Sequence, residues 1–408
     1  MSIELRPYQP DEARRYLEVC EMAFGEGVNE AGLASWLPLL ERERSLCAID
    51  DGAMVATAGI YSFSMTIPGG ELPVAAVTMV GVLPSHRRRG ILTSMMRRQL
   101  EDVRGRGEPI AILWASEGGI YQRFGYGLAS LIGRIQVDRA RTTYRRPTPP
   151  QGRMRLIETD EAAALLPAIY DRFRRDVPGA VSRSEAWWRA GPLYDAEHVR
   201  RGAGPLFRAV YDVDGSPEGY ALYRIRSGWD FAGSLSTLLV REAIGVTPSA
   251  VADVWRFLFD VDLVAQIEAD RAEPDHPLLL LVEEPRRLRL TLGDGLWLRI
   301  VDVPGALTPR SYAARDALTL ELEDGFCPWN AGRWRVDARE ADGVRVERTS
   351  GAPDLVLDVT DLAAAYLGAF SFSDLRHAGR VTECRPGAVA RADRMFRTER
   401  APWNPVMF

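Results

Sequence analysis

The sequence predicts an α/β protein that continues into an α+β part, and three observations support this fold class. The length of 408 residues corresponds to two or three domains of about 150 residues each. Over residues 1–140, apolar residues recur at helical spacing between the continuous or alternating apolar runs that are typical of strands. From about residue 291, short alternating strands come first and helices follow them.

The composition is that of an ordinary globular protein, because 46% of the residues are hydrophobic and 26% are charged. No run approaches the ~18 to 20 apolar residues of a membrane-spanning helix, and the first residues do not resemble a signal peptide. We therefore expect a cytoplasmic protein with no membrane partner. All 51 basic residues are arginine, but the net charge is −5, which argues against nucleic-acid binding.

The first unit is predicted to begin with two amphipathic helices and two strands that an Asp-Asp-Gly turn joins. A third strand of small and β-branched residues should be buried on both faces. A basic, glycine-containing turn, a helix and another buried strand follow it. The expected ranges are 11–24, 30–40, 45–50, 54–67, 72–83, a helix from about 90, and 109–115.

A polar, proline-rich segment at 138–152 is the best candidate for a linker. The next unit repeats the order of the first, with expected elements at 161–174, 206–212, 219–227 and 249–259. It has no basic glycine turn, so we expect it to have lost the chemistry of the first unit. The third unit should contain strands at 296–303, 318–322, 333–338, 344–348 and 355–359, and helices at 360–367 and 388–396.

Cysteine and histidine residues are scattered along the chain without the spacing of a metal or redox site. We expect reduced thiols and no bound metal. The residues are Cys20, Cys47, Cys327, Cys384, His86, His198, His276 and His377.

The strongest motif is V-x-P-x-x-R-R-R-G at residues 82–90, between a predicted strand and a predicted helix. The first amides of a helix are unpaired, and together with the helix dipole they attract phosphate groups. Gly90 lets the backbone approach a phosphate closely, and Arg87, Arg88 and Arg89 add positive charge. The alternative is an arginine-rich, solvated helix start that binds no ligand.

Residues 87–92 (R-R-R-G-I-L) resemble the acetyl-coenzyme-A loop of the GNAT acetyltransferase superfamily, R-x-x-G-x-G/A. Leu92 stands where that family has a small residue. The resemblance implies acetyl-CoA as the co-substrate, and the candidate binding residues are Val82, Leu83, Arg87, Arg88, Arg89, Gly90 and Ile91.

A second segment, 115–127 (ASEGGIYQRFGYG), narrows the resemblance together with VLPSHRRRGIL and the terminal Phe408. The chain resembles the enhanced-intracellular-survival (Eis) family of bacterial N-acetyltransferases over its whole length. This resemblance implies a homo-oligomer, with a hexamer as the first expectation. It also implies a GNAT domain at 1–140, a degenerate GNAT-like domain at 153–290, and a sterol-carrier-protein-like domain at 291–408 whose tail enters the active site.

Acetyl transfer requires an unprotonated amine, although free alkylamines have a pKa near 10. Backbone N–H groups near Val82 and Leu83 could polarise the thioester carbonyl. Tyr126 could protonate the leaving thiolate, and the resemblance assigns it that role. The alternatives are Tyr121 as the donor and Tyr126 as an ordinary strand tyrosine.

The proton acceptor is less obvious, because no histidine is suitably placed. In the Eis family the terminal carboxylate, here that of Phe408, reaches the active site. A carboxylate with a pKa near 3.5 is a weak base, so it acts either as a base after desolvation or as an anchor for the ammonium group. A third possibility is that the tail packs only for stability.

The acceptor pocket is expected beside the first two helices, where Phe24, Glu26 and Trp36 offer aromatic rings and a carboxylate. Ser116, at the end of a strand, could bind the coenzyme or be an ordinary strand-end residue.

The leading hypothesis is direct, acetyl-CoA-dependent acetylation of a polycationic small molecule such as an aminoglycoside. The alternatives are a protein lysine ε-amine acetyltransferase and a lipid- or partner-binding protein without catalysis.

Overall fold

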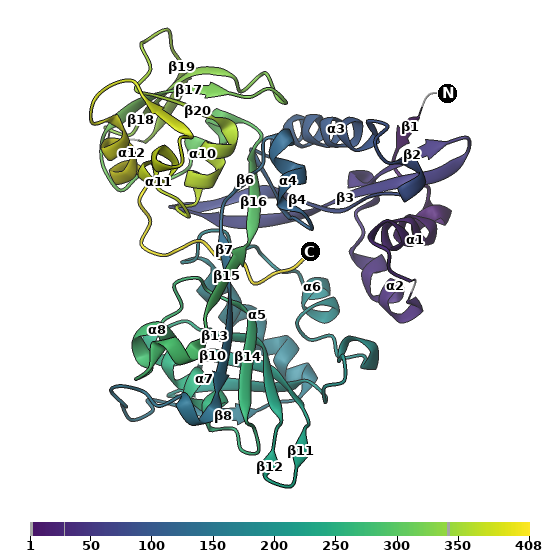
Figure 1. Cartoon of the computed structure of the whole chain (residues 1–408), viewed down its shortest axis with the longest axis vertical. Coiled ribbons are helices and arrows are strands. Elements are labelled where there is room, and N and C mark those ends of the chain that lie inside the picture. The colour runs from purple at the N-terminus through teal and green to yellow at the C-terminus, as the bar shows by residue number, and fades with distance from the viewer. Residues whose placement is uncertain (1–2, 28, 341–342) are drawn as a thin grey trace. The chain divides into compact units, whose positions relative to one another are not determined.

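A computed structural model describes residues 3–27, 29–340 and 343–408. The chain forms two compact units, 1–130 together with 294–408, and 131–293 (Figure 1). Among the described residues, no helix combines the length and the apolar character needed to cross a membrane.

The first unit is built on a seven-stranded sheet in the order β1-β2-β3-β4-β5-β16-β6. Its strands are β1 (Glu4–Arg6), β2 (Leu46–Asp50), β3 (Ala53–Ile67), β4 (Gly70–Val82), β5 (Ile110–Trp114), β16 (Leu296–Ile300) and β6 (Gly127–Leu128). The helices beside them are α1 (Ala13–Phe24), α2 (Glu30–Trp36), α3 (Ile91–Gly105) and α4 (Gly118–Tyr121).

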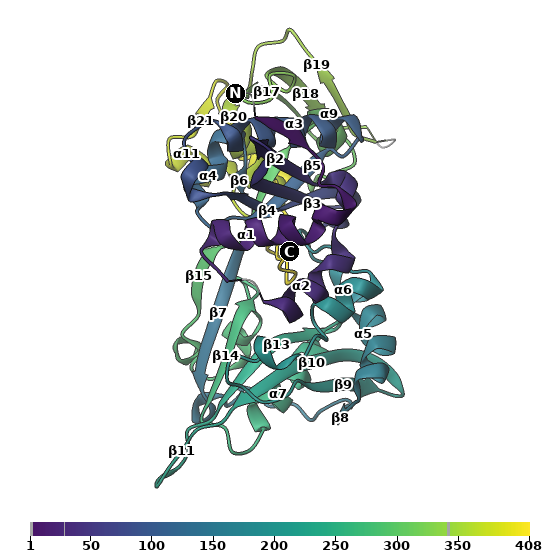
Figure 2. The same cartoon turned by 90° about the vertical axis from the view of Figure 1, so that its right-hand side faces the viewer.

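The helices α1 and α3 cover opposite faces of this sheet (Figure 2). Strand β2 shows why, since side chains alternate between the two faces of a strand. Cys47 and Ile49 pack in the cluster that contains α1. Leu46 and Ala48 pack instead in the cluster that contains the start of α3. The predicted helices and strands of residues 1–115 are present with small shifts at their ends.

The strand at 296–300 lies in a different sheet from the one its position in the sequence predicted. We assigned it to the third unit, but β16 pairs antiparallel with both β5 and β6 in the first sheet. Conversely, β7 (Leu131–Asp138), which we assigned to the first unit, belongs to the second sheet. The two compact units divide the chain at 130 and 294, and the three domain ranges implied by the family resemblance stay predictions.

The second unit contains a seven-stranded sheet in the order β15-β7-β14-β13-β10-β9-β8. The segment 138–152 is not a linker between units, because it lies inside this one, where Tyr144 is buried and donates to the carbonyl of Ala252. Further elements are β8 (Arg153–Leu156), α5 (Thr159–Arg174), α6 (Glu185–Ala190), β9 (Phe207–Val213), β10 (Ser216–Arg226), β11 (Trp229–Asp230), β12 (Gly233–Ser234), β13 (Thr237–Gly245), α7 (Pro248–Asp260), β14 (Gln266–Ala272), α8 (Leu278–Leu281) and β15 (Thr291–Asp294).

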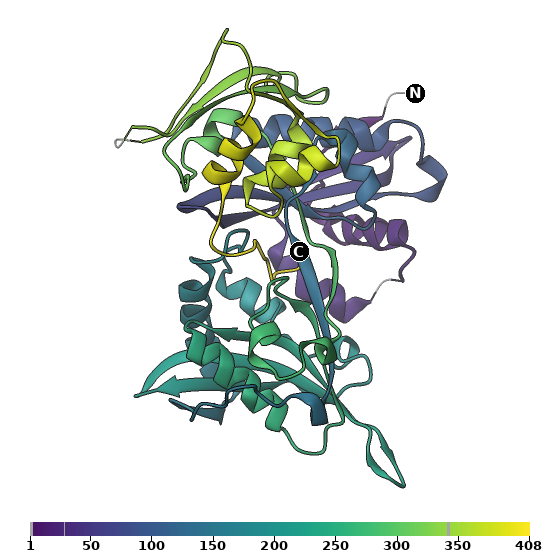
Figure 3. The same cartoon turned by 60° about the vertical axis from the view of Figure 1, so that its left-hand side comes forward.

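The carboxyl-terminal part of the first unit forms a five-stranded sheet in the order β19-β18-β17-β20-β21. Helices gather over this sheet (Figure 3). Its elements are α9 (Val303–Leu307), β17 (Ala317–Glu323), β18 (Gly332–Asp337), β19 (Arg345–Arg348), β20 (Leu355–Asp358), α10 (Val359–Tyr366), α11 (Phe372–His377), β21 (Val381–Glu383) and α12 (Ala388–Phe396). We did not predict α9, α11 or β21 from the sequence.

Helix α10 packs directly against β6 and β16 of the first sheet. Gly127 makes this possible, since a Cβ atom there would clash with the carbonyl oxygen of Thr360. The carboxyl-terminal part therefore adjoins the segment that carries Tyr126.

Candidate active site

The predicted phosphate-binding motif forms a turn between β4 and α3. Arg88 and Gly90 both adopt positive φ angles, 63° and 80°, and a Cβ atom at Gly90 would find nothing within 4 Å. The backbone beside Gly90 is thus open to a ligand. The first amides of α3, at 91–93, have no partner within the helix and form the anion-attracting end of its dipole.

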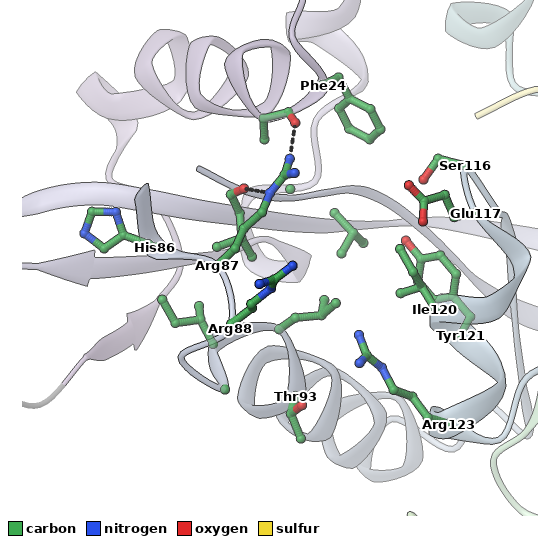
Figure 4. A pocket seen from close by; sticks show the side chains of 17 residues that line it. Phe24, His86, Arg87, Arg88, Thr93, Ser116, Glu117, Ile120, Tyr121 and Arg123 are labelled. Atoms are coloured by element: carbon green, nitrogen blue, oxygen red, sulfur yellow. Dashed lines mark hydrogen bonds between the residues drawn. The ribbon is translucent and has the colours of Figure 1, made fainter. Parts of the chain in front are cut away.

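A cavity of about 560 Å³ lies in front of this turn, a volume typical of ligand sites. Figure 4 shows the turn on one side of it and the segment after β5 on the other. The lining residues are Ala23, Phe24, Val80, Gly81, Val82, His86, Arg87, Arg88, Gly90, Ile91, Leu92, Thr93, Ser116, Glu117, Ile120, Tyr121 and Arg123.

The three consecutive arginines have different surroundings. Arg87 donates to the carbonyl of Val82 at 3.2 Å and to that of Ala23 at 2.9 Å, so its side chain is fixed at the wall of the cavity (Figure 4). Arg88 also lines the cavity and has no ion pair or hydrogen bond with the described residues. Arg89 pairs with Asp50 at 2.9 Å and is not among the lining residues, so the structure gives no support to its predicted role in coenzyme binding.

Strand β4 leaves its neighbour just before the turn. Its pairing with β5 ends at Ala76 and Ile112, and its register with β3 shifts between Thr57 and Gly59, which marks a bulge. Such bulges redirect strands beside active sites. From Val77 to Val82, one edge of β4 has no partner among the described strands, and this edge borders the cavity.

The amides of Val82 and Leu83 point in opposite directions. Leu83 donates to the carbonyl of Val55 on β3 at 2.9 Å, so its N–H group is not available to polarise a thioester. Successive residues of a strand direct their amides to alternate edges, so the amide of Val82 faces the open edge. Arg87 binds the Val82 carbonyl on that side. The amide of Val82 therefore remains a candidate for polarising the thioester carbonyl, and the amide of Leu83 does not.

The opposite wall contains two charged residues that the sequence analysis did not assign. Ser116, Glu117 and Arg123 follow β5 and line the cavity. The carboxylate of Glu117 has no partner among the described residues, and Arg123 stacks on Phe124 with a separation of 4.9 Å. Their position after the carboxyl end of a buried strand, where ligands of α/β sheets bind, could have indicated them.

The two candidate proton donors differ in exposure. Tyr126 is fully buried, and its hydroxyl group has no hydrogen-bond partner among the described residues. Tyr121 lines the cavity, and its ring meets that of Tyr126 edge to face at 6.0 Å. Burial raises the pKa of Tyr121 to about 12 and raises that of Tyr126 further. Both phenols are therefore protonated at neutral pH.

The three predicted acceptor residues do not all reach the cavity. Phe24, the last residue of α1, lines it and is 52% exposed. Glu26 and Trp36 are absent from its lining. Glu26 lies beside Glu21, whose pKa is raised by burial and then by this neighbouring carboxylate.

The tail returns to the first sheet. Trp403 and Val406 are buried, and the indole Nε1 of Trp114 donates to the carbonyl of Val406 at 2.9 Å. The ring of Phe408 lies 5.8 Å from that of Phe63 on β3. Phe408 itself is not among the cavity residues.

No group of three or more potential metal ligands occurs within residues 3–27, 29–340 and 343–408.

Comparison with known families identifies three matching segments. Acetyltransferase (GNAT) domain families match residues 4–129 and residues 179–300, and the sterol carrier protein domain family matches residues 303–405. The second match includes β16, which pairs in the first sheet. The order of the three matches confirms the predicted fold class.

Relatives match the chain along its length. An uncharacterized N-acetyltransferase of Streptomyces avermitilis is 41% identical over all of both chains. The N-acetyltransferase Eis of Mycobacterium tuberculosis is 32% identical over 92% of each chain. The crystal structure of Eis1 from Mycobacterium abscessus superposes with a TM-score of 0.86 at 34% identity, covering 99% of this chain and 100% of that one.

The different surroundings of Arg88 and Arg89 give a matched pair of variants. Arg88→Ala should raise the dissociation constant for coenzyme A about tenfold or more, because a charge-assisted phosphate contact contributes about 1.5–3 kcal/mol. Arg89→Ala should change it less than threefold, since that side chain pairs with Asp50. Isothermal titration calorimetry measures both, and equal losses would contradict the assignment.

Proposed function

The chain belongs to the Eis family of GNAT N-acetyltransferases, and we propose that it transfers the acetyl group of acetyl-CoA directly to a primary amine of a polycationic small molecule. Proteins with GNAT domains use acetyl-CoA. One observation carries the proposal. A single cavity has the amino-terminal end of α3, which can bind phosphate, on one wall and the unpaired carboxylate of Glu117 on the other.

The diphosphate of the donor fits the turn before α3. Amides 91–93 and the cation of Arg88 would oppose its negative charge. The pantetheine arm would then lie along the open edge of β4, where the amide of Val82 can donate to the thioester carbonyl. This arrangement directs the acetyl group toward the segment after β5.

Two side chains of the cavity, Glu117 and Phe24, suit a cationic acceptor. The carboxylate of Glu117 attracts an ammonium group, and the exposed ring of Phe24 offers a cation–π surface. An acceptor with several ammonium groups can use both contacts while one neutral amine reacts. Aminoglycosides and polyamines have this property.

Direct transfer is favoured over an acetyl-enzyme, because no cysteine lines the cavity. Burial raises the pKa of Cys20 to about 12 and that of Cys47 to about 11, so both are thiols rather than nucleophilic thiolates. In direct transfer the amine nitrogen forms the new bond to the carbonyl carbon, the carbon–sulfur bond breaks, and the thiolate takes a proton.

Tyr126 is our proposed proton donor. A buried hydroxyl group without a partner costs about 1–3 kcal/mol, and such orphaned groups occur at catalytic positions. A coenzyme sulfur within reach would supply the missing partner. Tyr121 lines the cavity and is the alternative donor.

We also propose that the chain forms a homo-oligomer, with a hexamer as the first expectation. The β11–β12 hairpin of the second unit bears Trp229 and Phe231 in exposed positions. Exposed aromatic residues of this size are typical of protein–protein contacts.

A thiol-release assay with acetyl-CoA and a panel of amines tests the proposed activity. Aminoglycosides and polyamines should give a higher kcat/KM than monoamines, because they can use a second ammonium contact. Lysine peptides that outcompete them would instead favour a protein acetyltransferase. Absence of thiol release with every amine, together with lipid in the purified protein, would favour a binding protein.

Replacement of Tyr126 by phenylalanine tests the proton donor. We expect Tyr126→Phe to lower kcat about 100-fold, at the lower end of general acid catalysis, with little change in the dissociation constant for coenzyme A. Tyr121→Phe is the matched control and should have a smaller effect on kcat. A larger loss in Tyr121→Phe would assign the proton transfer to Tyr121.

Extension of the tail tests the carboxylate of Phe408. One added glycine moves the carboxylate, whereas Phe408→Leu keeps it and removes only the ring contact with Phe63. If the carboxylate is a base, the extension should lower kcat for all amines. If it is an anchor, the extension should raise KM for polyamines. Unchanged kinetics in the extended chain would dismiss both roles.

A further inference from the structure

A buried ion pair lies next to the segment that carries Tyr126. Arg299 on β16 is fully buried, and its Nη2 atom donates to the carboxylate of Asp324 at 2.9 and 2.6 Å. Its other terminal nitrogen, Nη1, donates to the carbonyl of Gly125 at 3.4 Å. The guanidinium group of Arg299 therefore donates hydrogen bonds both to Gly125, the residue before Tyr126, and to Asp324 of the sterol-carrier-like part.

Gly125 is adapted to this contact. It has a φ of 83°, and a Cβ atom there would clash with the guanidinium group of Arg299. Any other residue would push the arginine away and strain the turn. The position of the arginine and the conformation of the turn thus depend on each other.

Asp324 begins a loop at residues 324–330, between β17 and β18, that rests on the first sheet's helices. Arg97 of α3 donates to the carbonyl of Phe326 at 3.2 Å and stacks over its ring. The same ring meets Phe124 at 5.0 Å. The 324–330 loop therefore contacts both the helix that begins at the proposed phosphate site and the turn before Tyr126.

The carboxylate of Asp324 is held within this loop. It accepts from the amide of Cys327 at 2.8 Å and from the side-chain nitrogen of Asn330 at 3.2 Å. A carboxylate with this many donors is fixed in place, and it fixes Arg299 in turn.

We propose that Arg299 and Asp324 are positioning residues for acetyl transfer: they hold the Gly125–Tyr126 turn, and the arginine's charge stabilises the phenolate that Tyr126 becomes. This inference rests on the proposed role of Tyr126 as the proton donor. The sterol-carrier-like part thereby contributes to the reaction through its 324–330 loop, separately from its tail.

The proton balance of the step is simple. The O–H bond of Tyr126 breaks as an S–H bond forms on the leaving coenzyme thiolate, and a phenolate remains. The acetylated nitrogen loses one proton to solvent, and solvent returns one to the phenolate. The phenolate exists between these events, when a nearby cation lowers its energy.

The charged and titratable groups around Tyr126 come from three elements. Burial raises the pKa of the phenol, and Arg299 on β16 opposes this effect. Tyr121 from α4 and Cys327 from the 324–330 loop raise that pKa further. Arg299 is the cation among these groups, so its removal should make Tyr126 a weaker acid.

The test compares two buried ion pairs. The variant combines Arg299→Met with Asp324→Asn, because removal of one partner of a buried ion pair destabilises a protein far more than removal of both. It removes both charges and leaves an amide oxygen at residue 324 that can accept from the amide of Cys327. The matched control is Arg183→Met with Glu242→Gln, a buried pair of the second unit. Both double variants are assayed for kcat, for the dissociation constant of coenzyme A, and for melting temperature.

We expect the Arg299/Asp324 double variant to bind coenzyme A as the native chain does, with kcat lowered about tenfold, a fraction of the general acid contribution. The control pair should leave kcat within twofold of the native value. In a Tyr126→Phe background, the Arg299/Asp324 changes should produce no further loss. If the double variant does not fold, the single variant Arg299→Lys tests the inference instead. It should lower kcat severalfold and leave the dissociation constant of coenzyme A unchanged.

Two results would overturn the inference. One is a kcat within twofold of the native value in the Arg299/Asp324 double variant, or in Arg299→Lys where that variant decides. The other is an equal loss in the native and Tyr126→Phe backgrounds, which would make the pair independent of Tyr126. Full activity of Tyr126→Phe alone would refute the proposed donor and the inference with it, so the two failures are distinguishable.

Discussion

The separation of β4 from β5 after Ala76 and Ile112 is the constraint on which the site depends. Two parallel strands that stay paired would satisfy each other's amides and leave no room between them. Their divergence leaves the amide of Val82 unpaired and opens the cavity between the turn and the segment after β5. A bulge follows in the pairing of β4 with β3, and it contains Met79, which has a φ of 52°.

Local features of the site could be predicted because local rules determine them. A strand that ends at a proline, followed by a basic turn and a helix, already specifies unpaired amides beside positive charge. Gly90 indicated a close approach of a ligand to the backbone, and in the structure a Cβ atom there would find nothing within 4 Å. The predicted elements of residues 1–115 are present for the same reason, since apolar periodicity is itself a local signal.

Features that depend on distant partners could not be predicted. Arg88 and Arg89 are identical in the sequence, and only Asp50, 39 residues away from Arg89, separates their surroundings. The amide of Leu83 has a partner on β3 that no motif indicates. The pattern at 296–303 predicts a strand but not its sheet, and β16 lies between β5 and β6 instead of in the third unit.

The position of β16 changes how the sterol-carrier-like part must be understood. A carboxyl-terminal domain attached by a linker could be lost without consequence for the first sheet. Here the chain enters that part directly from β16, which lies between β5 and β6, and α10 packs on β6 at Gly127. The tail then ends against Trp114 and Phe63. Because α10, the 324–330 loop and the tail all contact the first sheet or the turn before Tyr126, the sheet and the carboxyl-terminal part form one structural unit. The geometry of the site is therefore a property of both.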